Sequence, residues 1–303
     1  MKLFKKIAIG FLALLILVSI GGYIYFDQKF SPENNYLTVK KESGNIPMTW
    51  LGNDKNVLLL PIHFQGNQEK YYLQFDTGSP YTVFYSNSVQ AIKEISVNQD
   101  RAKASFLIGK TEISSAQFKI FKTGKGDKND SIKIIGTIGA DILEGRKTEI
   151  NFKENHIIFN LADVPASFKN HLIDFKFKKR KIIIPGTLKG EERKFLYDSG
   201  SSAYELLTYK EEWEKLKSKN SKVSIEKAKS WNDILTTYTA DCKQNIRFRD
   251  REIPLQEVTY VEGFSNAQFS LIKFSGMTGM LGNKIFLKNS LFIDCSDHKM
   301  GIH

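Results

Sequence analysis

The feature that most constrains the fold of this chain is an internal repeat. Residues 73–79 read LQFDTGS, and residues 195–201 read FLYDSGS. Each copy is an apolar stretch that ends in Asp-(Thr/Ser)-Gly-Ser. A single Asp-(Thr/Ser)-Gly is weak evidence, because it arises by chance in many chains of this length. Two copies in matching surroundings are strong evidence of a duplicated unit.

The matching surroundings extend to both sides of each copy. Upstream, Pro61 and Pro185 stand 124 positions apart, and the offset becomes 122 at Asp76 and Asp198. Downstream the repeat continues at an offset of 143 in two segments, 136–139 against 279–282 and 149–152 against 292–295. A repeat over roughly a hundred residues exceeds the supersecondary units of solenoids, so it predicts two homologous lobes and not an array.

The rest of the sequence predicts a mainly β fold with a sizeable hydrophobic core. Of 303 residues, 41% are hydrophobic and 25% are charged, which suffices for one large or two medium cores. Short β-favouring runs such as 58–64 and 71–75 alternate with turn signals. One helix is expected to open on a capping box at Thr208 and to bury Trp213 and Leu216.

The N-terminus predicts a membrane anchor. Residues 7–26 are an almost unbroken run of apolar residues, and the run is as long as a membrane-spanning helix needs. Because lysines precede them, residues 1–6 are expected to be cytoplasmic, residues 7–26 to form a transmembrane signal-anchor, and the rest to be exported. A cleaved signal peptide is the alternative, with a small-residue site at 19–21, but the length of the run favours the anchor. Residues 27–45 are interpreted as a stalk. In a bacterium, the exported part would lie on the periplasmic side of the inner membrane.

The paired motifs resemble those of the pepsin-like aspartic proteases. In that family one chain forms two lobes, and each lobe carries Asp-(Thr/Ser)-Gly and a later apolar-apolar-Gly strand. The resemblance covers about residues 46–303. It implies a β-barrel-like N-terminal lobe over 46–160, a connection over 161–181 and a similar C-terminal lobe over 182–303. A monomer is expected, because one chain supplies both lobes.

The resemblance also implies the roles of individual residues. Asp76 and Asp198 would be catalytic. The residues beside them would support the pair. Thr77 and Ser199 would cross-link the two loops through their hydroxyl groups, and Gly78 and Gly200 would let the backbone approach the carboxylates closely. Ser79 and Ser201 would donate hydrogen bonds to the outer carboxylate oxygens. Strands beneath the loops would contribute Ile138, Gly139, Leu281 and Gly282. A flap over bound substrate is expected at Ile108, Gly109 and Lys110.

Two neighbouring carboxyl groups suit the hydrolysis of a peptide bond. They cannot both ionise, so one keeps its proton; aspartic proteases are the established example. The ionised member can take a proton from water while the protonated one donates to the substrate carbonyl. The expected function is a membrane-anchored aspartic endopeptidase that cleaves peptide or protein substrates. The alternative is a catalytically inactive peptide-binding or scaffold protein that keeps this fold.

Other chemistries find little support. The net charge is +11, and residues 178–181 read KKRK. We interpret that run as the solvated face of a strand, because no nucleic-acid motif accompanies it. The histidines are scattered, so neither a metal nor a cofactor is expected. Cys242 and Cys295 would form either a disulfide or two buried thiols, and the sequence leaves both open.

Overall fold

The computed structural model describes residues 21–22, 25, 27–29, 31–52, 54–122, 132–230, 233–263 and 276–303. The chain divides into two compact units, Met1–Asn34 and Asn35–His303, and the fold below is that of the second. Within the described ranges, no helix is long and apolar enough to cross a membrane. The anchor predicted over residues 7–26 lies almost wholly outside those ranges.

The second unit is mainly β, as the sequence predicts, and its described strands form three sheets. The first lobe is built on a nine-stranded sheet, in the order β3 (Thr49–Leu51), β4 (Val57–Ile62), β5 (Tyr71–Phe75), β10 (Ile134–Ile138), β6 (Val83–Tyr85), β9 (Thr111–Phe121), β8 (Arg101–Ile108) and β7 (Ser96–Asn98), with β1 (Thr38–Lys40) beside β9. The second lobe is built on an eight-stranded sheet, in the order β14 (Lys176–Lys178), β15 (Lys181–Leu188), β16 (Glu191–Tyr197), β21 (Gly279–Leu281), β17 (Leu206–Thr208), β20 (Arg251–Glu262), β19 (Asp233–Phe248) and β18 (Val223–Ser230).

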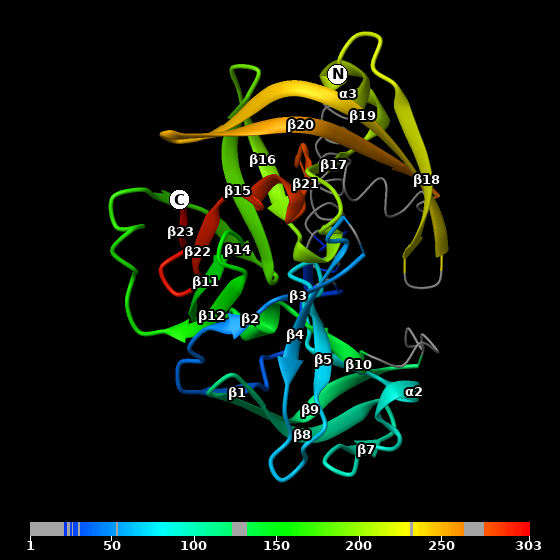
Figure 1. Ribbon diagram of the computed structural model, residues 1–303, viewed down its shortest axis with the longest axis vertical. Coiled ribbons are helices and arrows are strands. Elements are labelled where there is room, and N and C mark those ends of the chain that lie inside the picture. The colour runs from blue at the N-terminus through cyan, green and yellow to red at the C-terminus, as the bar shows by residue number, and fades with distance from the viewer. Residues whose placement is uncertain are drawn as a thin grey trace, which may run out of the picture. The chain divides into compact units, whose positions relative to one another are not determined.

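The strand order of the first sheet is repeated in the second, and so are the strand directions. In each lobe the strand before the aspartate pairs in parallel with a later strand, β5 with β10 and β16 with β21. Corresponding short helices follow: α2 (Ser86–Val89) and α3 (Lys210–Leu216), then η1 (Ala140–Ile142) and η3 (Lys284–Phe286). Figure 1 shows the first-lobe strands in its lower half and those of the second lobe in its upper half.

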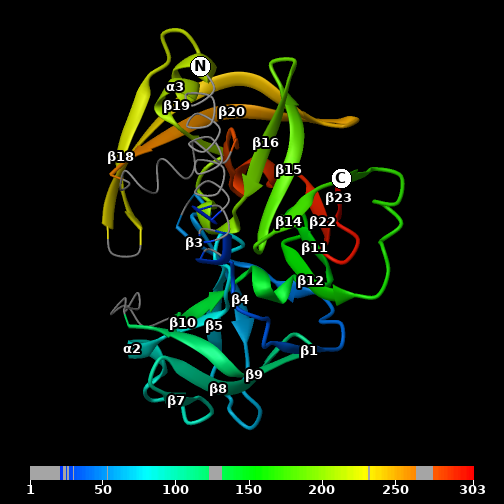
Figure 2. The same ribbon diagram turned by 180° about the vertical axis from the view of Figure 1, so that it is seen from behind.

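A six-stranded sheet joins the two lobes. Its order is β13 (Leu172–Asp174), β23 (Lys299–Ile302), β22 (Ser290–Asp294), β11 (Lys147–Asn151), β12 (His156–Leu161) and β2 (Ile46–Pro47). At its centre β11 pairs with β22, and Glu149 faces Phe292. These two residues are also equivalent in the sequence repeat, so the pairing is isologous, like the interface of a two-fold dimer. Figure 2 shows this sheet from behind, beside both lobes.

Side-chain alternation explains how the strands bury their faces. In β5, Tyr71, Leu73 and Phe75 are buried, while the two residues between them are partly exposed. In β4, Leu58–Ile62 are buried continuously, as expected for a strand that is covered on both faces. Together these strands carry the first aspartate at the end of a rigid support.

Several local predictions need correction. The folded unit begins at Asn35, within the expected stalk, because β1 pairs with β9. Trp213 and Leu216 are buried as predicted, but Thr208 ends β17, so α3 begins at Lys210 without a side-chain cap. The Thr208 hydroxyl donates instead to the backbone carbonyl of Thr278.

The two cysteines are both free and buried, which leaves the thiol alternative. Burial raises the pKa of the Cys242 thiol to about 11, and burial also raises that of Cys295. Neither thiol is therefore a reactive thiolate near neutral pH.

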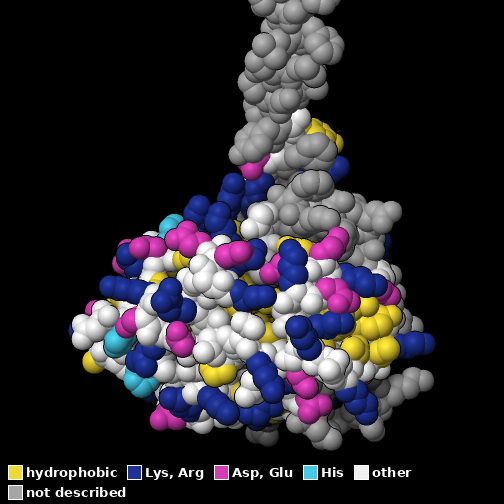
Figure 3. Space-filling view, turned by 90° about the horizontal axis from the view of Figure 1, so that it is seen from above, with side chains coloured by type: hydrophobic (Ala, Val, Ile, Leu, Met, Phe, Trp, Pro, Cys, Tyr) yellow, Lys and Arg dark blue, Asp and Glu magenta, His cyan; other side chains and the backbone are white. Residues whose placement is uncertain are grey.

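The surface shown in Figure 3 mixes the two signs of charge. Lysine and arginine side chains lie among aspartate and glutamate across that face. The positive net charge therefore does not gather into one uniform patch on this side.

The shared sheet gives a stability prediction. Ile150 is fully buried between Ile157 of β12 and Leu291 of β22. We expect Ile150→Ala to lower the free energy of unfolding by about 2–5 kcal/mol, because it leaves a cavity where the lobes join. Urea unfolding measures this. Val97→Ala, on an exposed strand position, is the control and should change stability by less than about 0.5 kcal/mol. Equal effects of the two substitutions would contradict the assignment of the six-stranded sheet as a structural core.

Candidate active site

Asp76 and Asp198 occupy equivalent places at the ends of β5 and β16. The backbone N–H of Asp76 donates to the carbonyl of Ile138 at 3.0 Å, and that of Asp198 donates to the carbonyl of Leu281 at 2.9 Å. Each loop is therefore held by the parallel neighbour of its own strand, at residues that the sequence analysis singled out.

Reciprocal hydrogen bonds tie the two loops together. The backbone N–H of Thr77 donates to the Ser199 hydroxyl at 2.9 Å, and the N–H of Ser199 donates to the Thr77 hydroxyl at 3.0 Å. Each hydroxyl then donates across the lobes, Thr77 to the carbonyl of Tyr197 and Ser199 to that of Phe75, at 3.1 and 3.0 Å. Both side chains are buried, so these bonds are shielded from water.

The two glycines make room for the carboxyl groups of the opposite lobe. A Cβ on Gly78 would lie 2.7 Å from Cγ of Asp198, and a Cβ on Gly200 would lie 2.5 Å from Cγ of Asp76. A Cβ at either place would therefore displace the carboxyl group of the opposite aspartate. A second pair, Gly139 and Gly282, passes equally close beneath the loops, where added Cβ atoms would overlap backbone atoms of Tyr81 and Ser201.

The carboxyl groups of Asp76 and Asp198 lie close together, each against the glycine of the opposite loop. Burial, and then the charge and hydrogen bond of Asp198, raise the pKa of Asp76 from 3.8 to about 7. Asp198 receives a different set of donors: the Gly200 N–H lies 2.9 Å from its Oδ1, and the Ser201 hydroxyl 2.9 Å from its Oδ2. The raised pKa of Asp76 indicates that this carboxyl keeps its proton in mild acid.

Ser79 departs from its predicted role. Its hydroxyl donates to the carbonyl of Tyr81 at 2.9 Å, and its backbone N–H is the group that donates to Asp76 Oδ1, at 3.1 Å. Ser201, by contrast, donates to its aspartate through the hydroxyl as predicted. The two halves of the repeat are therefore chemically unequal at this position.

The sequence analysis overlooked Asp141, a buried carboxylate beneath the first loop. It accepts hydrogen bonds from the Thr82 backbone N–H and hydroxyl, each at 2.7 Å. Burial raises its pKa to about 6, although Thr82 and the charge of Arg180 act in the opposite direction. The sequence feature that could have indicated its burial is its position in an apolar stretch, between Ile138 and Leu143.

The basic run at residues 178–181 also differs from its prediction. Arg180 is buried and lies 3.0 Å from a carboxylate oxygen of Glu144. Lys181 donates to the carbonyl of Gly78. Two of the four cations thus contact the first lobe near Asp76, where a solvated strand face was expected.

The candidate flap is a tightly anchored turn. Ile108 is fully buried, and the N–H of Lys110 donates to the carbonyl of Ser43 at 2.9 Å. Gly109 also lies against Ser43, where a Cβ would overlap its carbonyl oxygen. The turn is therefore fixed to the N-terminal segment of the folded unit, so the prediction of a flap at these three residues is wrong.

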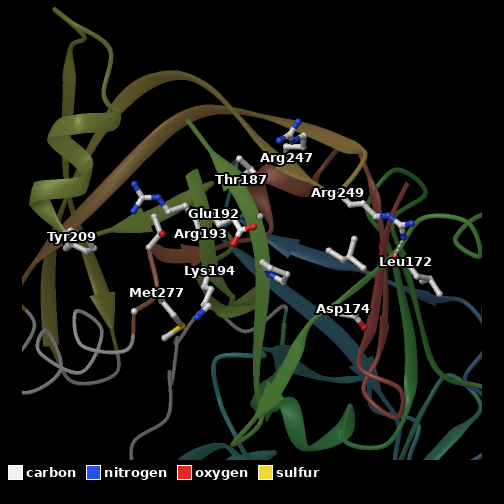
Figure 4. Close-up of a pocket in the computed structure, with 15 residues that line it drawn as sticks. Leu172, Asp174, Thr187, Glu192, Arg193, Lys194, Tyr209, Arg247, Arg249 and Met277 are labelled. Atoms are coloured by element: carbon white, nitrogen blue, oxygen red, sulfur yellow. Dashed lines mark hydrogen bonds between the residues drawn. The ribbon is translucent and has the colours of Figure 1, made fainter. Parts of the chain in front are cut away.

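A separate cavity of about 990 Å³ lies on the second lobe, away from both aspartate loops. Arg193, Lys194, Arg247 and Arg249 contribute to its lining, together with Asp174 and Glu192. Figure 4 shows that the cations do not converge: Arg249 extends to the carbonyl of Leu172, and Lys194 lies near Met277 at another edge. The arrangement indicates no single charged ligand.

The comparisons and a search for metal ligands add no assignment. No protein-family model matches the chain, and no curated protein matches it. In the part of the chain that the structure describes, no group of three or more His, Cys, Asp or Glu side chains could hold a metal ion.

The hydroxyl cross-link gives a prediction with a matched control. Thr77→Val removes a buried hydroxyl that both donates and accepts across the lobes. We expect a loss of about 1–3 kcal/mol in the free energy of unfolding, because two buried partners are left unsatisfied. Thr148→Val is the control, since the buried Thr148 hydroxyl has no hydrogen-bond partner among the described residues. Urea unfolding should show Thr148→Val within about 0.5 kcal/mol of the native protein; equal losses would refute a special role for the cross-link.

The raised pKa of Asp76 predicts a dependence of stability on pH. A carboxyl whose folded-state pKa is raised stabilises the fold most below its unfolded value, and this stabilisation is lost as pH rises through the folded value. For Asp76 the window runs from 3.8 to about 7. Asp76→Asn cannot ionise, so its stability relative to the native protein should increase between about pH 5 and about pH 8. Urea midpoints at both pH values test this, and a constant difference would contradict it.

Proposed function

We propose that this chain is an aspartic endopeptidase with the two-lobed pepsin-like fold. The observation that supports this most is the close pair of carboxyl groups of Asp76 and Asp198, on loops that Thr77 and Ser199 join by reciprocal hydrogen bonds. As whole residues, Asp76 and Asp198 are half-buried, so neither is sealed completely inside the fold. The repeated strand order supports the same reading.

The mechanism follows from the unequal donors. Asp198 would act as the carboxylate that accepts a proton from the attacking water, because Gly200 and Ser201 donate to it. Asp76 would hold the shared proton and donate it to the oxygen of the scissile carbonyl. The product of this step is a tetrahedral gem-diol without a covalent enzyme intermediate. Its collapse cleaves the C–N bond: one hydroxyl of the gem-diol returns its proton to Asp76 as the carbonyl re-forms, and the proton taken from water passes from Asp198 to the nitrogen of the leaving amine.

The setting of the enzyme is part of the proposal. Residues 7–26 would anchor it in the membrane with the protease unit exported, and one chain would form the whole site as a monomer. Its substrates would be peptides or unfolded proteins. No cofactor enters the steps above.

We expect cleavage of an unfolded protein substrate by residues 27–303, strongest in mild acid and falling as pH rises through about 7, where Asp76 loses the shared proton. Asp76→Asn and Asp198→Asn should each lower kcat by at least roughly a hundredfold. The measurement is kcat/KM against pH, with and without a pepstatin-type inhibitor.

Asp163→Asn, at an exposed aspartate, is the matched control and should leave the profile unchanged. Cleavage that survives both substitutions in the pair would refute the proposed mechanism. Peptide binding without cleavage at any pH would favour the inactive scaffold.

A further inference from the structure

The surroundings of the two aspartates differ most at a cationic turn. β14 and β15 form a hairpin in which Lys178 faces Lys181, so Lys179 and Arg180 make a two-residue turn. Both have positive φ, 53° and 58°. Turns of this type favour Asn and Gly, because side chains with a Cβ are strained there. Long cationic side chains at a strained turn suggest that their contacts matter.

Arg180 fixes this turn against the first lobe. Its Nε and Nη2 lie 3.1 and 3.0 Å from Oε2 of Glu144, and its Nη1 donates to the carbonyl of Pro80 at 3.3 Å. Its guanidinium also lies 5.3 Å from the centre of the Tyr81 ring. A buried and fully engaged arginine sets the place of its neighbour with little freedom.

That neighbour is Lys181, whose ammonium reaches the loop of Asp76. It donates to the carbonyl of Gly78, the glycine that packs against the carboxyl of Asp198. Its charge lowers the pKa of Asp76, against the larger effects of burial and of Asp198. One half-buried cation from the second lobe therefore faces the pair from the side of the first loop.

The sequence repeat has no equivalent cation on the other side. At the offset of 124, the counterparts of Arg180 and Lys181 are Asn56 and Val57. Among the residues that the structure describes, two phenols also face the pair, Tyr85 toward Asp76 and Tyr197 toward Asp198. Burial raises the pKa of both, so they stay neutral in the working range.

We propose that Lys181 is a positioning residue that fixes the Asp76 loop and sets the upper pH limit of the aspartate pair. This inference rests on the proposed function for its meaning in catalysis. A cation beside a carboxyl favours the ionised form, so the pair loses its shared proton at a lower pH than it otherwise would. Lys181 thereby restricts turnover to more acidic conditions and makes the two duplicated aspartates electrostatically unequal.

The test uses the full-length chain and neutral variants. Lys181→Met removes both the charge and the donor, whereas Lys181→Gln removes the charge and keeps N–H donors for Gly78. For both we expect the alkaline limb of kcat/KM to move upward by on the order of one pH unit. Lys181→Arg keeps the charge and should retain the native limb. Lys178→Met, at an exposed lysine across the hairpin, is the control and should not move it. If Lys181→Met and Lys181→Gln fold and the alkaline limb of their kcat/KM profiles stays at the native pH, the proposal is overturned.

A second readout does not depend on turnover. Titration of the aspartate carboxyl carbons by ¹³C NMR should show a higher upper pKa of the pair in Lys181→Gln than in the native protein. If the native chain cleaves nothing but this shift is seen, the proposed function fails and the assignment of Lys181 stands. If the native chain cleaves and no shift is seen in either neutral variant, the assignment of Lys181 fails alone.

Discussion

The structure depends on holding two acidic side chains close together. Like charges at hydrogen-bond distance repel, so neither lobe would place its aspartate there without compensation. The compensation is geometric and electrostatic: Thr77 and Ser199 lock the loops by reciprocal buried bonds, and the pair retains a proton. The cost that remains is the burial of the Asp76 carboxyl, whose ionised form is favoured in water.

Rigid support on either side makes that arrangement possible. The loops end strands that lie within sheets, and each is bonded to a parallel neighbour at Ile138 or Leu281. The six-stranded sheet then fixes one lobe against the other through the β11–β22 pairing. Because this pairing and the loop contacts obey the same two-fold equivalence, a small rotation of one lobe would strain both at once.

Much of the fold and of the candidate site could be predicted from the sequence, because the duplicated unit repeats the same motifs at nearly constant offsets. The motifs around Asp76 and Asp198, with the glycines behind them, define where the strands end. What could not be predicted are contacts set by side-chain direction and by distant packing. The Ser79 hydroxyl donates to the carbonyl of Tyr81, and Gly109 packs closely against the carbonyl of Ser43. From the sequence, Arg180 is predicted to face solvent, because no neighbouring residue indicates that Glu144 lies opposite it in the fold.

A duplicated site cannot remain symmetric if it must share one proton. Two identical surroundings would leave the proton without a preferred carboxyl, whereas acid and base roles require one to hold it and the other to accept from water. The halves have diverged at the places that decide this. The Ser201 hydroxyl donates to its carboxylate and that of Ser79 does not. Lys181 faces the Asp76 loop, where its counterpart is Val57, and its charge opposes protonation of Asp76 by lowering the pKa of that carboxyl. The fold keeps its two-fold frame for position, and the departures from it make the surroundings of the two carboxyl groups unequal.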